Sequence, residues 1–130
     1  MSGKYKPLLI SNNPLILTKF EAQNCCKVSK KDDLREVFIE ARDLIHRSCS
    51  LLTHPLAGSI QPYRNPYRTI AVDEDNGDFD LRSLKIIEKA LARYRGRWPD
   101  REYHHYNREL LADLEKLDYN LVKKFIKSHE

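Results

Sequence analysis

The chain has 130 residues and a mass of 15.3 kDa, which is enough for one domain with a buried core. Hydrophobic residues make up 41% and charged residues 32% of the sequence, and no apolar run approaches the length that spans a bilayer. The first residues also lack the apolar stretch of a signal peptide, so we expect a cytoplasmic protein without a membrane partner.

The three cysteines are Cys25, Cys26 and Cys49. An odd number of cysteines in a cytoplasmic protein argues against a disulfide framework. The adjacent pair lacks the two-residue spacer of a redox motif, and the five histidines show no metal-ligand spacing. We therefore expect buried or half-buried thiols, no bound metal and no cofactor.

The first elements are a strand and a short helix. The apolar run Leu8–Ile10 predicts a strand that is covered on both faces. Asn13 followed by Pro14 is typical of a helix N-terminus, with the asparagine as the capping residue. A helix should continue past Phe20, and residues 25–29 predict a weaker second strand.

A longer amphipathic helix follows. Asp33 and Glu36 have the spacing of a capping box, and apolar residues then recur at helical spacing as far as Ser48. The run 51–53 predicts a third strand, and 68–72 predicts a fourth. Strands that alternate with helices indicate an α/β fold, and we expect a small, mostly parallel sheet of about four strands flanked by helices.

The C-terminal half is helical. Asp80 should cap a helix that runs to about Tyr94, after an acidic turn at 73–78 that does not match a calcium-binding loop. A second helix should run from Asp100 to about Lys127, with one apolar stripe formed by Tyr103, Tyr106, Leu110, Leu114, Leu117, Leu121 and Phe125. Its length of about 40 Å exceeds what a small sheet needs, so it either wraps the domain or docks on a second copy as a homodimer.

We therefore divide the chain into a core domain, residues 1–94, and a connector with the long C-terminal helix, residues 95–130. The connector gathers arginines from Arg93 to Arg101 with Tyr94 and Trp98. Arginines beside aromatic residues can bind nucleic acid, but Gly96, Pro99 and Asp100 favour a solvated linker, so we expect no nucleic-acid partner.

The long loop between the third and fourth strands is the best place for a functional site. Residues 53–68 read THPLAGSIQPYRNPYR, and a loop this long without periodicity is usually functional or disordered. If the first and third strands are parallel neighbours, their following loops emerge at the same edge of the sheet. The candidate ligand-binding residues are then Asn12, Asn13, Thr53, His54, Gly58, Ser59, Arg64 and Arg68.

A helix N-terminus and an arginine fork both favour a small anionic ligand. Other roles remain open for each residue. Asn12 and Asn13 could serve only as turn and capping residues, and Arg64 and Arg68 could pair with Asp73 or Glu74 at the surface. His54 could hydrogen-bond the loop in place, bind a ligand, or act as a catalytic general acid or base.

Three segments of the chain resemble the GrdX family, small proteins encoded in glycine, sarcosine and betaine reductase gene clusters. They are ISNNPL at 10–15, ARDLIH at 41–46 and LLTHPLAGSIQPYRNPYR at 51–68, and the resemblance runs from about Tyr5 to Tyr94. It implies a non-enzymatic accessory protein whose partners are reductase components or a small anion. The alternative is a small enzyme that acts on an anionic metabolite through His54.

Overall fold

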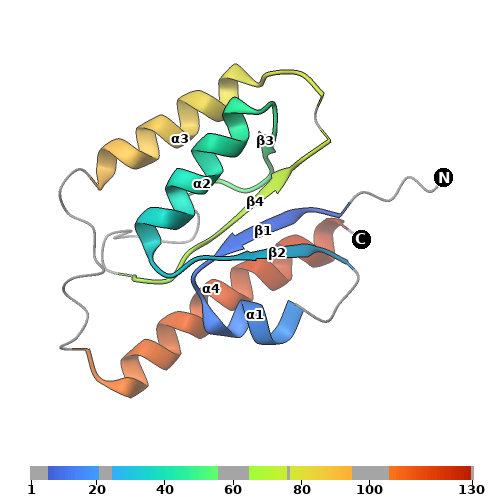
Figure 1. The fold of residues 1–130 in the computed structure, drawn as a ribbon. Coiled ribbons are helices and arrows are strands. Elements are labelled where there is room, and N and C mark those ends of the chain that lie inside the picture. The colour runs from blue at the N-terminus through green and yellow to red at the C-terminus, as the bar shows by residue number, and fades with distance from the viewer. Residues whose placement is uncertain (1–5, 21–24, 56–64, 76, 95–105, 130) are drawn as a thin grey trace.

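The computed structural model describes residues 6–20, 25–55, 65–75, 77–94 and 106–129 (Figure 1). Within these ranges one sheet contains the strands Leu8–Ser11 (β1), Lys27–Lys30 (β2), Ser50–Leu51 (β3) and Thr69–Asp73 (β4). Four helices accompany it: Pro14–Phe20 (α1), Leu34–His46 (α2), Leu81–Arg93 (α3) and Arg108–His129 (α4). The predicted α/β fold is confirmed. None of the described helices is both long enough and apolar enough to cross a membrane.

The sheet is mixed, so the prediction of a mostly parallel sheet was wrong in this respect. Its strand order is β2-β1-β4-β3, with β1 parallel to β2 and β4 antiparallel to both of its neighbours. Parallel neighbours need a crossover connection, usually a helix, and none of the described residues between β3 and β4 is helical. Strands β1 and β3 were expected to be neighbours, but β4 lies between them. They still point in the same direction, because both are antiparallel to β4.

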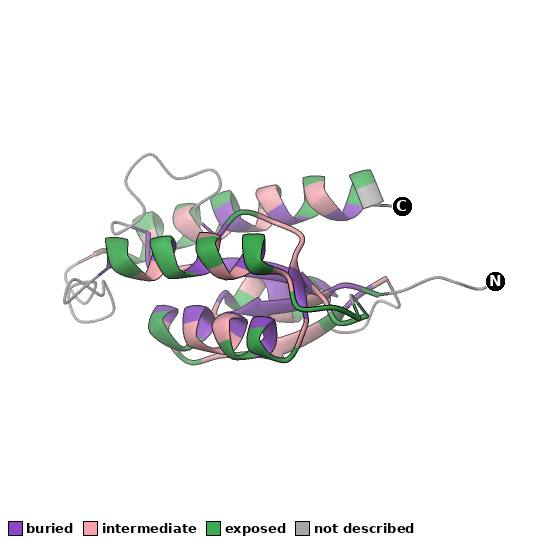
Figure 2. Cartoon of the chain, turned by 90° about the horizontal axis from the view of Figure 1, so that it is seen from above, coloured by how far each residue is buried: buried purple, intermediate pink, exposed green. Residues whose placement is uncertain are grey.

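The core has two layers, one on each face of the sheet (Figure 1). Helices α2 and α3 cover the face that carries Ile10, Ile70 and Val72. Helices α1 and α4 cover the face that carries Leu9 and Ala71. Strands β1 and β4 are therefore buried on both sides, which explains their continuous apolar sequences (Figure 2).

Helices α1, α2 and α3 each begin at the residue that follows the predicted capping residue. Asn13 and Asp80 accept backbone hydrogen bonds from Leu15 and Arg82, and Asp33 accepts one from Glu36, as predicted. Helix α4 starts at Arg108 after the cap Asn107, later than the predicted Asp100, which lies outside the described residues.

The C-terminus of α2 has an unusual residue in a common motif. The backbone N–H groups of Ser48 and Cys49 donate to the carbonyls of Ile45 and Leu44, as in a Schellman motif. Ser48 has φ +74°, a left-handed conformation that usually belongs to glycine.

The face of α4 that packs on the sheet differs from the predicted stripe. The buried residues are Asp118, Val122 and Ile126, while Leu110 and Leu117 remain 41% and 47% exposed. The apolar surface of α4 is thus wider than its contact with the sheet.

The cysteines are thiols, as expected. Cys26 and Cys49 are buried and Cys25 is half-buried, with 3.9 Å between the sulfur atoms of the adjacent pair. Burial is the main reason that the pKa of Cys26 rises to about 12.

Candidate functional site

Strands β1 and β3 run in the same direction on either side of β4, and the chain after β3 continues beside β4 toward the end of the sheet where β1 stops. Ser11, the last residue of β1, is paired with Thr69, the first residue of β4. On the other side, Leu52 donates to the Ala71 carbonyl at 2.8 Å, and the Thr53 hydroxyl accepts from the Ala71 N–H at 3.0 Å. The segments that follow the first and third strands therefore leave the sheet together.

Asn12 joins the end of β1 to the segment that precedes β4. Its Nδ2 donates to the Pro66 carbonyl at 2.7 Å, and its Oδ1 accepts from the Arg68 N–H at 2.9 Å. Both functional groups of the amide are used within the protein, so the turn-forming role foreseen for Asn12 is the one that the geometry displays.

Asn13 is fully buried and serves two helices. Its Oδ1 caps α1, and its Nδ2 donates to the Glu115 carbonyl at 2.9 Å and to Asp118 Oδ2 at 3.0 Å. Glu115 and Asp118 both belong to α4. Asn13 therefore holds the C-terminal helix against the edge of the sheet.

Asp118 is the centre of a buried polar network at this edge. The carboxylate accepts hydrogen bonds from the Thr69 N–H at 3.2 Å, the Thr69 hydroxyl at 2.7 Å and Asn13 Nδ2 at 3.0 Å. The Thr69 and Ser11 hydroxyls are 2.8 Å apart. Burial raises the pKa of Asp118, although its hydrogen bonds with Asn13 and Thr69 and the charge of Arg68 oppose the shift.

A cavity of about 240 Å³ opens beside this network. Its polar lining consists of Thr53, His54, Arg68, Thr69 and Asp118, and its apolar wall consists of Leu121, Val122 and Phe125 from α4. Arg68 is only 4% exposed, whereas His54 lies at the surface. The cavity thus combines a guanidinium, an imidazole and a carboxyl group in a small volume, a set of groups that can orient a small polar molecule.

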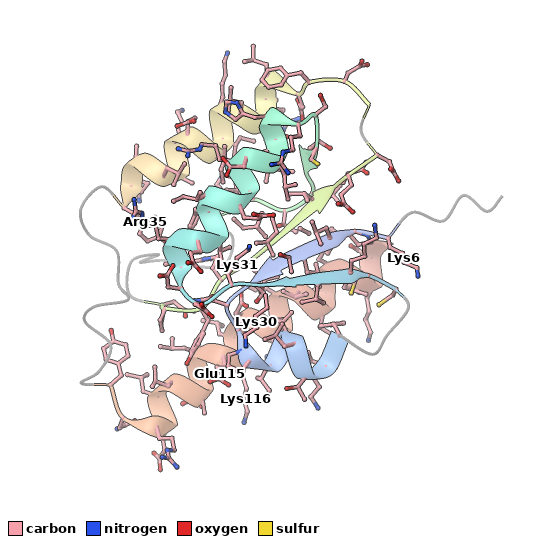
Figure 3. All side chains as sticks on the ribbon, in the orientation of Figure 1. Lys6, Lys30, Lys31, Arg35, Glu115 and Lys116 are labelled. Carbon is pink, nitrogen blue, oxygen red and sulfur yellow. The ribbon has the colours of Figure 1, made fainter. Side chains whose placement is uncertain are left out.

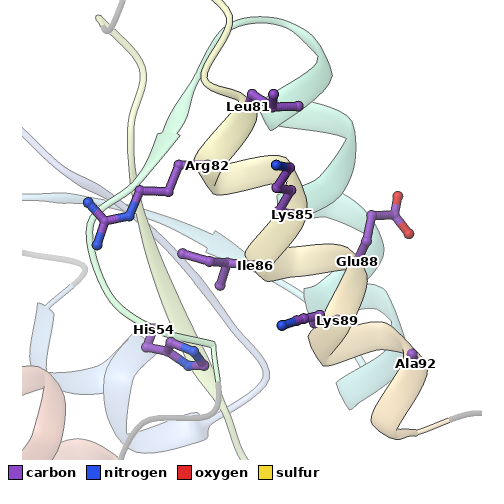
Figure 4. Close-up of a pocket in the computed structure, with 8 residues that line it drawn as sticks. All are labelled: His54, Leu81, Arg82, Lys85, Ile86, Glu88, Lys89 and Ala92. Carbon is purple, nitrogen blue, oxygen red and sulfur yellow. The ribbon is translucent and has the colours of Figure 1, made fainter.

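A larger open hollow of about 1000 Å³ lies on the other side of His54, against α3 (Figure 4). Arg82, Lys85 and Lys89 line it together with a single acidic residue, Glu88. Ile86 supplies part of the apolar surface between these charges. We call this surface the basic groove, and its excess of positive charge suits an anionic partner.

More positive charge lies on the β2 side of the same edge. Lys30 ends β2, Lys31 follows it, and Arg35 lies in the first turn of α2 (Figure 3). Lys31 is 3.5 Å from the Glu40 carboxylate, while Lys30 and Arg35 are exposed.

Three of the predicted site residues, Gly58, Ser59 and Arg64, lie outside the described residues, as does most of the arginine-rich connector. Asp73 and Glu74 were the alternative surface partners considered for Arg64 and Arg68, and of these Glu74 pairs with Lys27 at 3.0 Å. Within the described ranges, no group of three or more His, Cys, Asp or Glu side chains could hold a metal ion.

Asp118 was not among the site residues predicted from the sequence, whereas Thr53, His54 and Arg68, which line the same cavity, were. A signal existed, because Asp118 is four residues before Val122 and eight before Ile126 and so shares their helical face. A charged residue on the face that docks on a sheet is rare unless it is paired.

The chain matches the family model of the GrdX-like proteins over residues 8–127. The match includes α4, whereas the resemblance seen in the sequence ended near Tyr94. No curated protein and no solved structure shows significant similarity to the chain. Because the family model covers nearly the whole chain, including both segments that form the edge cavity, the protein belongs to the GrdX-like family.

Proposed function

We propose that this protein is a non-enzymatic accessory protein of a glycine, sarcosine or betaine reductase-type system. In this proposal it binds an anionic group, either as a small ligand or as part of a partner protein, at the edge where β1 and β3 end. The family relationship supports the setting, since GrdX proteins are encoded in gene clusters of such reductases.

One observation carries the binding site. Arg68 and His54, which belong to opposite ends of the long loop, line the same cavity. A guanidinium that is largely removed from water binds a carboxylate or phosphate more strongly than an exposed one. Asp118 would oppose an anion when it is ionised, but burial raises its pKa and so disfavours the ionised form, and Arg68 supplies positive charge beside it.

The basic groove supports the partner version of the same proposal. It continues from His54 along α3, and its positive charges would attract an acidic segment whose terminal anionic group enters the cavity.

Thermal unfolding with inorganic phosphate or acetate tests the cavity. At a concentration of 100 times Kd, a ligand that binds only the native state adds about 2.7 kcal/mol of stability, which corresponds to roughly 10 °C in Tm. The stabilisation should be lost in His54→Ala and kept in His46→Ala, a matched exposed histidine at the end of α2. Sodium chloride at the same ionic strength is the reference. Equal stabilisation of both variants, or none of the wild type, would contradict the proposed cavity.

Co-purification from cells that express the reductase tests the partner. The reductase components should remain bound to the wild type and to His46→Ala, and a variant with Arg82, Lys85 and Lys89 changed to glutamate should lose them. Absence of every reductase component from the wild-type sample would remove the accessory role.

A small enzyme remains the second candidate, because Asp118 supplies a carboxyl group in the cavity that His54 lines. Acid-base catalysis needs a proton donor and acceptor near the substrate, and these two residues belong to the types that provide them. His54→Ala should then abolish turnover of the anionic metabolite while partner capture persists.

A further inference from the structure

Helix α4 has a second apolar surface, separate from the surface that packs on the sheet. Leu110, Leu114, Leu117 and Leu121 recur at spacings of four, three and four residues. This spacing is the heptad pattern of helices that pair side by side. We call these four residues the leucine seam.

The leucine seam is largely uncovered in the single chain. Leu110 is 41% and Leu117 is 47% exposed, and Leu114 and Leu121 are half-buried. At 3.6 residues per turn the seam lies about a third of a turn from the buried residues Asp118 and Val122. The seam therefore lies beside the contact of α4 with the sheet, on a part of the helix that is exposed or half-buried. Single exposed leucines are common, but a row of them marks an interface.

The charges beside the leucine seam change sign along the helix. On its solvent side, the first half of α4 carries Glu109 and Asp113, and the second half carries Lys124 and Lys127. All four side chains are exposed. A shallow hollow of about 380 Å³, lined by Leu117, Leu121 and the lysines, adjoins the basic half.

This reversal of sign is complementary to itself. In an antiparallel pair, the acidic half of one helix lies against the basic half of the other, and a two-fold axis produces both contacts at once. In a parallel pair, the lysines of both copies would lie together and repel each other. We infer that the occupant of the leucine seam is a second copy of this chain, and that the two α4 helices pair in antiparallel orientation.

This inference does not depend on the proposed cavity function. Leu121 belongs to the leucine seam and also lines the cavity, but Leu117, the residue changed in the dimer test, does not line the cavity. The basic groove is on α3. The dimer could therefore be disproved while anion binding is retained, and the reverse is equally possible.

Light scattering and analytical ultracentrifugation of the full chain over a wide concentration range test the dimer. The wild type should change from 15.3 kDa to twice that mass as its concentration rises. Leu117→Glu removes a leucine from both copies, so the dimer Kd should rise by more than about a hundredfold. Circular dichroism should show that the monomer is still folded, because Leu117 contacts solvent.

Ala112→Glu is the matched control. Ala112 is exposed and lies on the opposite side of α4 from the leucine seam, so the same charge there should leave the dimer intact. A wild type that is monomeric at every concentration would overturn the inference, and so would equal dimer Kd values for Leu117→Glu and Ala112→Glu.

Charge reversal tests the orientation. Changing Lys124 and Lys127 to glutamate should weaken an antiparallel dimer, and adding the changes of Glu109 and Asp113 to lysine should restore it. In a parallel dimer the same change would replace lysine facing lysine with glutamate facing glutamate, so the dimer Kd should hardly change. A dimer Kd that is the same with and without the two lysine reversals would therefore overturn the antiparallel assignment.

Discussion

The attachment of α4 to the sheet can be measured through Asn13. This side chain is completely buried, caps α1 through its Oδ1 and donates to Glu115 and Asp118 of α4 through its Nδ2. Asn13→Ala would remove the cap, worth about 1 kcal/mol, and two buried hydrogen bonds worth about 1 kcal/mol each. We therefore expect the free energy of unfolding to fall by about 3 kcal/mol.

Asp33→Ala provides the matched comparison. Asp33 also caps a helix, accepting from the Glu36 N–H at 2.9 Å. Among the described hydrogen bonds, its side chain makes none to a second helix. Its replacement should lower the free energy of unfolding by only about 1 kcal/mol. The difference of about 2 kcal/mol between the two variants isolates the connection between Asn13 and α4.

Urea unfolding followed by circular dichroism gives both free energies, because a domain of this size is expected to unfold in one step. Hydrogen exchange would add the location, since α4 amides should lose protection in Asn13→Ala and keep it in Asp33→Ala. Two variants with the same stability to within about 0.5 kcal/mol would refute the reasoning that α4 is held at this edge by buried hydrogen bonds.

Three further predictions concern single groups. Burial raises the pKa of Asp118, so the folded protein binds this proton more tightly than the unfolded chain. The free energy of unfolding of the wild type, relative to that of Asp118→Asn, should therefore be highest below pH 3.8, the ordinary pKa of an aspartate, and should fall as the pH rises through the raised pKa. A difference in stability that grows with pH would contradict the direction of the shift. Ser48→Gly should increase the free energy of unfolding by about 1 kcal/mol, because φ +74° strains serine and not glycine, and urea unfolding would show an unchanged or lower value if the strain is absent. The Cys26 thiol, with a pKa of about 12, should react with iodoacetamide much more slowly in the folded protein than in urea at pH 8, as peptide mass spectrometry can measure; equal rates would mean that it is not buried.

The sequence predicted the local features of the fold well, because their causes are local. A capping side chain bonds a backbone N–H two or three residues away, so Asn13, Asp33 and Asp80 could be recognised from their neighbours alone. The direction of β4 has no local cause. An apolar run has the same composition in a parallel as in an antiparallel strand, and only the hydrogen-bonded partners β1 and β3 determine it.

The candidate site was predictable in part for the same reason. Thr53, His54 and Arg68 are close to the ends of predicted strands, and for that reason they were grouped in one candidate site; the structure places all three in the lining of one cavity. The leucine spacing of α4 was also visible, but spacing alone could not show which of its two apolar surfaces contacts the sheet. The structure buries Asp118, Val122 and Ile126 and leaves the leucine seam outside.

Asp118 shows why the cavity and α4 have to be considered together. Its partners Thr69 and Asn13 are 49 and 105 residues away in the chain, so no sequence window contains the network. Asp118 and three apolar residues of α4 form one wall of the cavity, while His54 and Arg68 come from the long loop. A substitution of Asp118 therefore alters the stability of the fold and the lining of the cavity at once, because its hydrogen bonds attach α4 to the sheet beside the cavity. His54 is exposed and lines both the cavity and the basic groove, so its substitution should alter these two surfaces with less effect on folding than a substitution of buried Asp118. This difference helps to separate a change in ligand binding from a change in folding.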